Sequence, residues 1–436
     1  MPDKTIYESP RIKRLLDDLQ QPLNVHGEII AQFWEEMKAG DVPFFEPYEI
    51  PDDEHILVTF LYEGDETTKT VNLGANFMGR MDDDPINWVM HHIPDTNIWY
   101  WTEKIARDLR TGYFITPNHP APENLDSPEK RHAFLKAICL PDPLNKKVFK
   151  RPLHSGQLQG ENATVLQSIF EAPDAIPETY ATQRAGIAKG TLTKHNLTGQ
   201  FYAYEHVFWV YTPPNYDPQR AEPYPLLFVF DGYLYLEAIQ LPTILDNLLS
   251  EGKIPPLICV MLNSEPDNRS KELMPNEILH RAIQDDWIPF VQHTYHICTD
   301  PAHNIIGGMS LGGLAAAWNA FKNPHIFGNV LSQSGSFWWF PATNNPQLSD
   351  PDDREEGWLI RQFAYREKLK MKFYLDVGRY EHDGEGWSHR NLNRHMRDVL
   401  IAKGYPVTYQ EYVGYHDHIW WQLTIVDGLL ALFNDG

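Results

Sequence analysis

The chain has 436 residues, enough for two or three domains with at least one large hydrophobic core, so a small scaffold held together by disulfides or metal is excluded. Hydrophobic residues make up 42% of the sequence and charged residues 22%, which excludes wholesale disorder and a fibrous repeat. The 37 Lys and Arg are outnumbered by 59 Asp and Glu, and the net charge of −22 makes nucleic acid an unfavourable partner.

The cysteines and the hydropathy pattern bear on the compartment. Cys139, Cys259 and Cys298 are isolated thiols without C-x-x-C spacing, so neither a disulfide framework nor a zinc knuckle is indicated. Charged and apolar residues alternate at the N-terminus, which is unlike a signal peptide, and no apolar run reaches the roughly 18 residues of a spanning helix. We expect a cytoplasmic protein with no membrane partner.

Residues 1–45 are predicted to form a helical arm, because apolar residues in 29–37 recur with a period near 3.6 and Gly40 follows them. Residues 46–160 are predicted to form an all-β sandwich domain of the immunoglobulin-like kind. Their short β-branched or alternating runs, separated by turn residues, are 56–62, 69–73, 87–91, 97–101 and 112–116. The stretch 117–160 is rich in Pro, Asn, Asp and Lys, which predicts irregular chain along the surface.

Residues 161–195 are predicted to be a linker, with the boundary between the domains near 180–195, and residues 196–436 to be a second domain. In this domain strand-like runs alternate with helical ones. The predicted strands are 201–211, 225–230, 257–262, 304–306, 329–332, 372–377 and 408–412, and the predicted helices are 238–250, 277–295, 312–321, 357–367 and 390–403. This alternation predicts an α/β domain with a mostly parallel sheet covered on both faces.

The strongest chemical signal is the pentapeptide Gly308-Met309-Ser310-Leu311-Gly312, which stands between a predicted strand and a predicted helix. A bare G-x-S-x-G arises by chance about one time in seven in a chain of this length, so its context decides. Glycines at both ends permit the sharp turn of a nucleophile elbow, and the helix start favours negative charge nearby. The motif predicts an α/β-hydrolase fold with Ser310 as nucleophile.

A serine hydroxyl needs a histidine to accept its proton and a carboxylate to orient that histidine, in the chain order serine, acid, histidine. His416 is the predicted base, because it lies in a glycine-containing loop after a predicted strand; competing histidines are His389, His395 and His418. For the acid, several carboxylates surround the end of strand 372–377. Glu381 is the first choice, and Asp383 and Asp376 remain alternatives.

The tetrahedral intermediate of ester hydrolysis also needs backbone N–H donors for its oxyanion. One predicted donor is Leu311, directly after the nucleophile, and the other is Gly232 or Tyr233, in the loop after the predicted strand 225–230.

With these residues in view, the chain resembles the iron-enterobactin (enterochelin) esterases, cytoplasmic serine hydrolases that open the trilactone of a catecholate siderophore. The second domain alone would also resemble esterase-D-like enzymes, but the likeness extends over roughly residues 30–430. Segments that carry it in the second domain are 230–232, 269–273, 308–313, 331–339 and 414–420, and those in the first are 33–34, 58–61, 97–100, 108–110 and 141–145.

The resemblance implies Ser310 as nucleophile, His416 as base and Glu381 as orienting carboxylate. It also implies that Arg269 helps bind the anionic ligand and that Trp338 and Trp339 line the pocket. A ferric tris-catecholate carries about three negative charges, so a net-acidic enzyme must offer it a local cationic and aromatic surface.

The function expected from the sequence is hydrolysis of the ester bonds of ferric enterobactin or a related siderophore through an acyl-serine intermediate. No cofactor is expected, because iron arrives as part of the substrate. Two alternatives remain: an esterase acting on carbohydrate-linked or thioester substrates, and a siderophore-binding protein without turnover. The sequence leaves open which siderophore is cleaved, how many bonds are cut, the oligomeric state, and whether the sandwich domain is a lid or a support.

Overall fold

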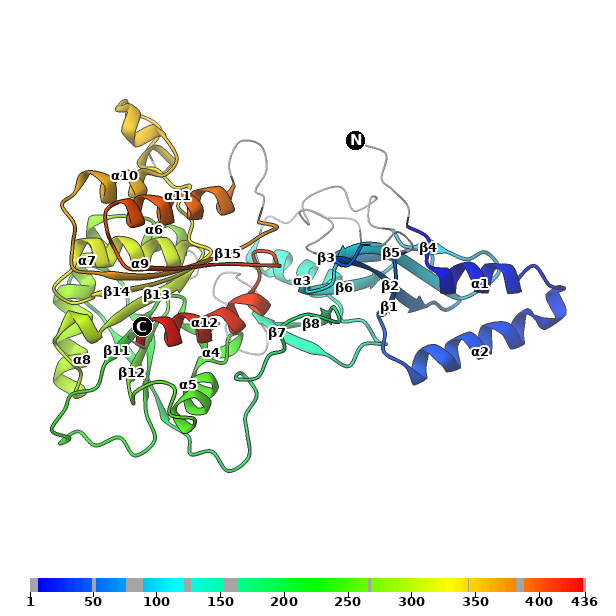
Figure 1. Cartoon of the computed structure of the whole chain (residues 1–436), viewed down its shortest axis with the longest axis horizontal. Helices are drawn as coiled ribbons and strands as arrows, with labels where there is room; N and C mark the ends of the chain where they lie inside the picture. The colour runs from blue at the N-terminus through cyan, green and yellow to red at the C-terminus, as the bar shows by residue number, and fades with distance from the viewer. Residues whose placement is uncertain are drawn as a thin grey trace. The chain divides into compact units, whose positions relative to one another are not determined.

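The computed structural model describes residues 7–48, 52–75, 89–120, 127–152, 164–265, 268–343, 345–381 and 388–433. The chain divides into two compact units, Met1–Pro177 and Glu178–Gly436 (Figure 1). In the part of the chain that is described, no helix combines the length and apolar character needed to cross a membrane.

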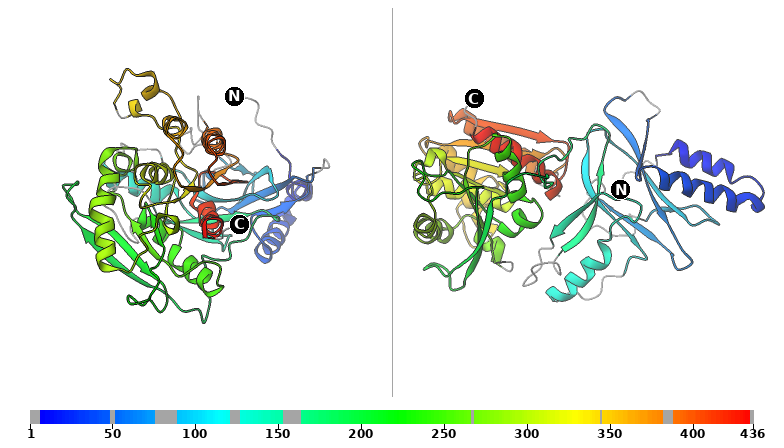
Figure 2. Two further views of the ribbon diagram at one scale, coloured as in Figure 1. Left: turned by 60° about the vertical axis from the view of Figure 1, so that its left-hand side comes forward. Right: turned by 90° about the horizontal axis from the view of Figure 1, so that it is seen from below.

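The first unit begins with two helices, α1 (Pro10–Asp18) and α2 (His26–Ala39), which lie side by side in two views (Figures 1 and 2). Helix α1 starts at Ser9, whose Oγ accepts the backbone N–H of Ile12 at 3.2 Å. Apolar residues of both helices share a core with Phe44, Leu61 and Ile98 of the neighbouring strands. The predicted helical stretch 29–37 lies within α2.

Two antiparallel four-stranded sheets follow in the first unit. One has the order β1 (Phe44–Glu46), β2 (His55–Glu63), β5 (Ile98–Ala106), β4 (His91–His92), and the other β3 (Val71–Ala75), β6 (Arg110–Pro117), β8 (Thr164–Glu171), β7 (Val148–Pro152). Phe60 of the first sheet lies 4.8 Å from Tyr113 and 5.9 Å from Phe170 of the second, measured between ring centroids. The sheets therefore pack face to face through aromatic side chains.

Two predictions of irregular chain are corrected here. The stretch 117–160 contains helix α3 (Pro128–Ile138), which Ser127 caps, and strand β7. The predicted linker 161–195 contains β8, a strand of the first unit, and the start of β9 (Thr191–Leu197), a strand of the second. Strands β7 and β9 each pair with the next strand along the chain, and β8 also pairs with the more distant β6, so sheet pairing overrides the local proline and polar content.

The second unit has one eight-stranded mixed sheet, in the order β16–β15–β14–β13–β11–β12–β10–β9. Strands β11 to β16 are parallel to their neighbours within this group, and β10 runs antiparallel to both β12 and β9. The bounds of the strands not yet given are β10 His206–Thr212, β11 Leu226–Val229, β12 Ile258–Leu262, β13 Ile305–Met309, β14 Asn329–Gln333, β15 Lys372–Gly378 and β16 Val407–Tyr412.

Helices cover both faces of this sheet (Figure 1). One face packs against α6 (Arg269–Leu273), α7 (Glu277–Ala282), α8 (Ile288–Thr294), α9 (Leu311–Lys322), α10 (Trp358–Tyr365) and α11 (His389–Ala402), and the other against α4 (Gly232–Glu237), α5 (Leu241–Ser250) and α12 (His418–Phe433). In β11, Leu226 and Phe228 join the first core and Leu227 and Val229 the second. Because successive side chains of a strand alternate, the apolar run of a central strand fills both cores.

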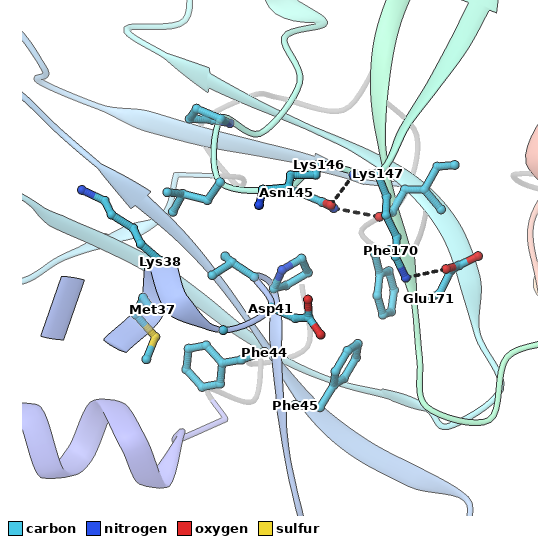
Figure 3. A pocket seen from close by; sticks show the side chains of 16 residues that line it. Met37, Lys38, Asp41, Phe44, Phe45, Asn145, Lys146, Lys147, Phe170 and Glu171 are labelled. Carbon is cyan, nitrogen blue, oxygen red and sulfur yellow. Dashed lines mark hydrogen bonds and ion pairs between the residues drawn. The ribbon is translucent and has the colours of Figure 1, made fainter. Parts of the chain in front are cut away.

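The first unit also contains a cavity of about 700 Å³ between the end of α2 and the segment Pro143–Lys147 (Figure 3). Phe44, Phe45 and Phe170 line it, and Lys147 pairs across its rim with Glu171 at 2.8 Å. None of the residues predicted for the active site lines this cavity.

Candidate active site

Ser310 stands between β13 and α9, at the carboxyl edge of the parallel strands. Its backbone has φ 57° and ψ −121°, a conformation that non-glycine residues rarely adopt and that a nucleophile elbow requires. The N–H of Ser310 donates to the carbonyl of Gln333 in the neighbouring strand β14 at 2.8 Å. The turn is therefore fixed to the sheet.

Close packing requires glycine at 308, within the motif, and at 313, directly after it. A Cβ atom on Gly308 would lie 2.4 Å from the carbonyl group of Gly312, and one on Gly313 would lie 2.6 Å from Ser332 Oγ. The end of β13 and the first turn of α9 thus touch directly, and this contact forms the elbow.

Replacing Gly308 by alanine is expected to lower the free energy of unfolding by about 2 kcal/mol, because the new methyl group must displace backbone atoms. Urea denaturation followed by circular dichroism measures the change. Gly27→Ala is the control, since a Cβ there meets no atom within 4 Å. Equal stability of the two variants would contradict the packing argument.

Three predicted residues from three strand ends form a continuous hydrogen-bonded chain. His416, in the loop after β16, places Nε2 2.8 Å from Ser310 Oγ and Nδ1 2.7 Å from Oε2 of Glu381, which follows β15. If Nδ1 carries the proton, it donates to the carboxylate and leaves the Nε2 lone pair for the serine hydroxyl. This arrangement can deprotonate Ser310.

Glu381 is buried, with 3% of its surface exposed. Its second oxygen, Oε1, accepts hydrogen bonds from Ser334 Oγ at 2.6 Å and from the N–H of Gly378 at 2.8 Å. Burial raises the pKa of this carboxyl group, but His416 and the hydrogen bonds outweigh it and hold the pKa below its ordinary value. Glu381 is thus a fixed, ionised partner for the imidazole at neutral pH.

Of the two candidate acids that the structure describes, Glu381 and Asp376, Glu381 forms the hydrogen bond with His416. Asp376 is buried within β15, where its carboxylate accepts the N–H of Ser334 at 3.2 Å, and burial raises its pKa well above the ordinary value. Asp383 lies outside the described residues. Among the competing histidines, His389 has its ring centroid 4.8 Å from that of His416.

Two serines that the sequence analysis did not assign support the site. Ser334, at φ 49°, donates Oγ–H to Glu381 and accepts the indole N–H of Trp421 at 3.0 Å. Ser336 donates its backbone N–H to the carbonyl of Ser310 at 3.1 Å, and its Oγ lies 3.4 Å from the Ser310 hydroxyl. The sequence did contain one signal for these serines: both follow β14, the strand that pairs with β13, which precedes Ser310.

Replacing Ser334 by alanine is expected to lower kcat by about tenfold with little change in KM, because the carboxylate of Glu381 loses a charge-assisted hydrogen bond that orients it. Steady-state kinetics on a chromogenic ester measures this split. A raised KM with unchanged kcat would show that Ser334 acts elsewhere.

The predicted oxyanion donors differ in availability. The N–H of Tyr233 donates to Asn263 Oδ1 at 3.1 Å, so this predicted donor is already engaged. Within the described ranges, the backbone N–H groups of Leu311 and Gly232 donate to no protein acceptor. Gly232 must be glycine, because a Cβ would lie 2.3 Å from the carbonyl oxygen of Met261. Leu311 and Gly232 are the available pair.

The three residues implied to bind substrate lie in different surroundings. Arg269 forms a two-pronged ion pair with Asp231, with both N–O distances 2.6 Å. Trp339 does not line a pocket, because its ring packs in the core against Trp358 and only 3% of the residue is exposed. Trp338 is half-buried. Its indole N–H donates a hydrogen bond to Nε2 of His389, with 3.3 Å between the two nitrogens.

Glu381, His389 and His416 also present potential metal ligands, whose donor atoms lie within 4.8 Å of one another. Both ring nitrogens of His416, however, are engaged by Ser310 and Glu381. The hydrogen bonds therefore match a proton-transfer chain, and a metal ion here would have to replace them.

Two family models match the sequence. The esterase model matches residues 204–432, which include the elbow and the loop of His416. The model described as enterochelin esterase, N-terminal, matches residues 57–179, most of the two-sheet unit. The chain belongs to the enterochelin esterase family. As a member of this family it is a carboxylic ester hydrolase.

The chain is similar along nearly its whole length to curated proteins. It is 25% identical over 417 residues to the iron(III) enterobactin esterase of Dickeya dadantii, covering 91% of each chain. It is 24% identical over 413 residues to the iron(III) salmochelin esterase of Escherichia coli O6:H1, covering 93% of this chain and 94% of the relative. The enterobactin esterase of Shigella flexneri, solved in the presence of enterobactin, shares its fold with a TM-score of 0.70 at 22% identity, covering 92% and 97% of the two chains.

Proposed function

We propose that this protein is a serine esterase that hydrolyses the ester bonds of a catecholate siderophore trilactone, ferric enterobactin or a relative, and so releases iron. The observation that carries the proposal is the chain of hydrogen bonds from Ser310 Oγ through His416 to Glu381, at 2.8 and 2.7 Å. The family provides the substrate class, because similar proteins over the full length are named iron(III) enterobactin and salmochelin esterases.

In the first half of the reaction, Ser310 Oγ attacks the ester carbonyl carbon while His416 Nε2 takes the hydroxyl proton. Glu381 holds the imidazole in place and stabilises its positive charge. The N–H groups of Leu311 and Gly232 stabilise the oxyanion of the tetrahedral intermediate. When the intermediate collapses, the ester C–O bond breaks and His416 returns the proton to the leaving alcohol.

In the second half, His416 takes a proton from water, and the hydroxide attacks the acyl-serine carbonyl. The second intermediate collapses to the carboxylic acid, and Ser310 recovers its proton from His416. These steps are proton transfers and acyl transfers carried by the protein's own groups. We therefore propose that no cofactor takes part and that iron is only a component of the substrate.

The finer features of the fold belong to the same proposal. The first unit is proposed to be an immunoglobulin-like sandwich, which the face-to-face packing of its two antiparallel sheets supports. The second is proposed to be an α/β-hydrolase domain, which the serine after β13, the acid after β15 and the histidine after β16 support. The expected cytoplasmic location fits a substrate that is opened after uptake.

Product analysis tests the proposal. Purified protein is incubated with ferric enterobactin, with a glucosylated relative and with a feruloylated sugar, and the products are measured by liquid chromatography with mass spectrometry. We expect release of dihydroxybenzoylserine units from the siderophores. Preference for the feruloylated sugar would instead establish a carbohydrate esterase, and absence of any turnover would indicate a binding protein.

A further inference from the structure

The ion pair between Arg269 and Asp231 lies beside the elbow and is not explained by ligand binding. We propose that Arg269 is a positioning residue: through Asp231 it holds the N–H of Gly232 in the oxyanion hole, and it does not bind the anionic ligand. This inference rests on the proposed function as a serine esterase.

The pair has the geometry of a rigid clamp. Arg269 Nε donates to Asp231 Oδ1 and Nη2 donates to Oδ2, each at 2.6 Å. Asp231 is 3% exposed, and 21% of the Arg269 side chain is exposed. Two parallel hydrogen bonds from a planar guanidinium fix the orientation of a carboxylate as well as its position. The carboxylate of Asp231 takes two of the five guanidinium N–H donors and neutralises the positive charge, so Arg269 offers an anionic ligand no net positive charge.

The backbone of Asp231 determines where the Gly232 N–H points. Asp231 has φ 55° and ψ 48°, a left-handed conformation that a non-glycine residue keeps only when its surroundings hold it. Its carbonyl accepts the N–H groups of Leu234 at 2.8 Å and Tyr235 at 3.2 Å, so it points into α4. In a trans peptide the N–H points opposite to the carbonyl, so the N–H of Gly232 points out beyond the start of α4.

The clamp also joins this loop to the nucleophile turn. A Cβ on Gly312 would lie 3.2 Å from Asp231 Oδ2 and 3.5 Å from Phe230 Cβ, so the loop lies against the first turn of α9. The N–H of Phe230 donates to the carbonyl of Gly307 at 3.2 Å. The side chain of Asp231 thus lies between Arg269 and the helix that begins after Ser310.

Helix α6, which carries Arg269, is itself fixed. Its Glu272 is buried and accepts the phenol of Tyr204 at 2.6 Å, the ring N–H of His206 at 3.3 Å and the backbone N–H of Glu265 at 3.3 Å. Arg269 therefore extends from a helix that is held in place, and its contact with Asp231 can hold the loop of Asp231 and Gly232 in position.

Two substrates and a double-mutant cycle test the proposal. Asp231→Asn, Arg269→Gln, the double variant and Arg269→Lys are assayed on ferric enterobactin and on the uncharged ester p-nitrophenyl butyrate. We expect Asp231→Asn and Arg269→Gln to lower kcat by about 10- to 100-fold on both substrates with little change in KM, because oxyanion stabilisation is common to both. The double variant should lose no more than the worse single variant, since both act through one contact. Lys271→Gln, which removes an exposed cation from the same helix, is the control and should match the wild type.

A ligand-binding Arg269 predicts the opposite pattern. Arg269→Gln would then leave p-nitrophenyl butyrate hydrolysis unchanged and raise only the KM for the ferric siderophore, and Asp231→Asn would lower that KM by freeing the guanidinium. Either result overturns the proposal. If Asp231→Asn does not fold by circular dichroism, Arg269→Lys decides: it keeps the charge but loses the two-pronged contact, so it must lower kcat on the neutral ester. If the wild type hydrolyses this ester no faster than Ser310→Ala, the proposed function itself fails.

Discussion

Replacing Ser310 by alanine is expected to lower kcat for ferric enterobactin by about 10⁴- to 10⁶-fold, the range of losses for serine hydrolases without their nucleophile. Without Oγ, His416 has no hydroxyl to deprotonate and no acyl-enzyme can form. The fold should be retained, because the Ser310 backbone makes the bonds that fix the turn. Release of dihydroxybenzoylserine, followed over hours, measures the residual rate.

Ser336→Ala is the matched control, because it removes a hydroxyl only 3.4 Å from that of Ser310. Its kcat should fall by no more than about tenfold, the effect of one lost hydrogen bond. A fluorophosphonate probe should label the wild type and Ser336→Ala but not Ser310→Ala. Equal product release by Ser310→Ala and the wild type would refute the assignment of the nucleophile.

Replacing Glu381 by glutamine is expected to lower kcat by about 10⁴-fold, the loss seen when a triad carboxylate becomes an amide. The amide can donate a hydrogen bond to His416 Nδ1, which favours the tautomer whose Nε2 carries a proton and cannot accept the one from Ser310. It also leaves the imidazolium without its buried counter-charge. Single-turnover kinetics on a chromogenic ester resolves a loss of this size.

The variant Asp376→Asn distinguishes the role of Asp376 from that of Glu381, the other buried carboxyl group considered as the acid. Because Asp376 bonds to the backbone of Ser334 while Glu381 bonds to His416, this variant should keep kcat within about threefold of the wild type. The reverse order of effects, with Asp376→Asn inactive and Glu381→Gln active, would show that the assignment of the acid is wrong.

The pKa of Glu381 also predicts an effect on stability. Its folded-state pKa lies below its ordinary value of 4.5, so the ionised carboxylate contributes stability above that pH, and the contribution is lost as the pH falls through the folded-state pKa. Urea unfolding across this acid range should show a steeper loss for the wild type than for Glu381→Gln. Parallel curves would contradict a lowered pKa.

The local motif allowed the elbow to be predicted, and the structure shows why. Glycine at 308 is required because a Cβ there would meet the backbone of Gly312, and such a requirement can be read directly from the sequence. The apolar runs of central strands such as β11 and β12 were equally clear, because burial on both faces favours apolar residues. Strands β7, β8 and β9 and helix α12 were missed, because strand pairing and tertiary packing override a weak local propensity.

The roles of several site residues outside the elbow could not be predicted from the sequence, because they depend on which side chains surround each residue in the fold. Arg269 looked like a ligand-binding cation because sequence does not reveal that Asp231, 38 residues earlier, occupies its guanidinium. Trp339 looked like a pocket wall because a tryptophan pair gives no sign of which ring turns into the core. The role of Ser334 could not be found without knowing that its hydroxyl meets Glu381.

The amino-acid order alone predicted the α/β class of the second unit, the candidate nucleophile and the candidate base, since each follows from short-range periodicity or from the position of glycines around a turn. The choice of Glu381 among neighbouring carboxylates, the loss of Tyr233 as an available amide and the pairing of Arg269 were decided by tertiary structure. These depend on distances between loops that meet only when parallel strands place their carboxyl ends at one edge of the sheet.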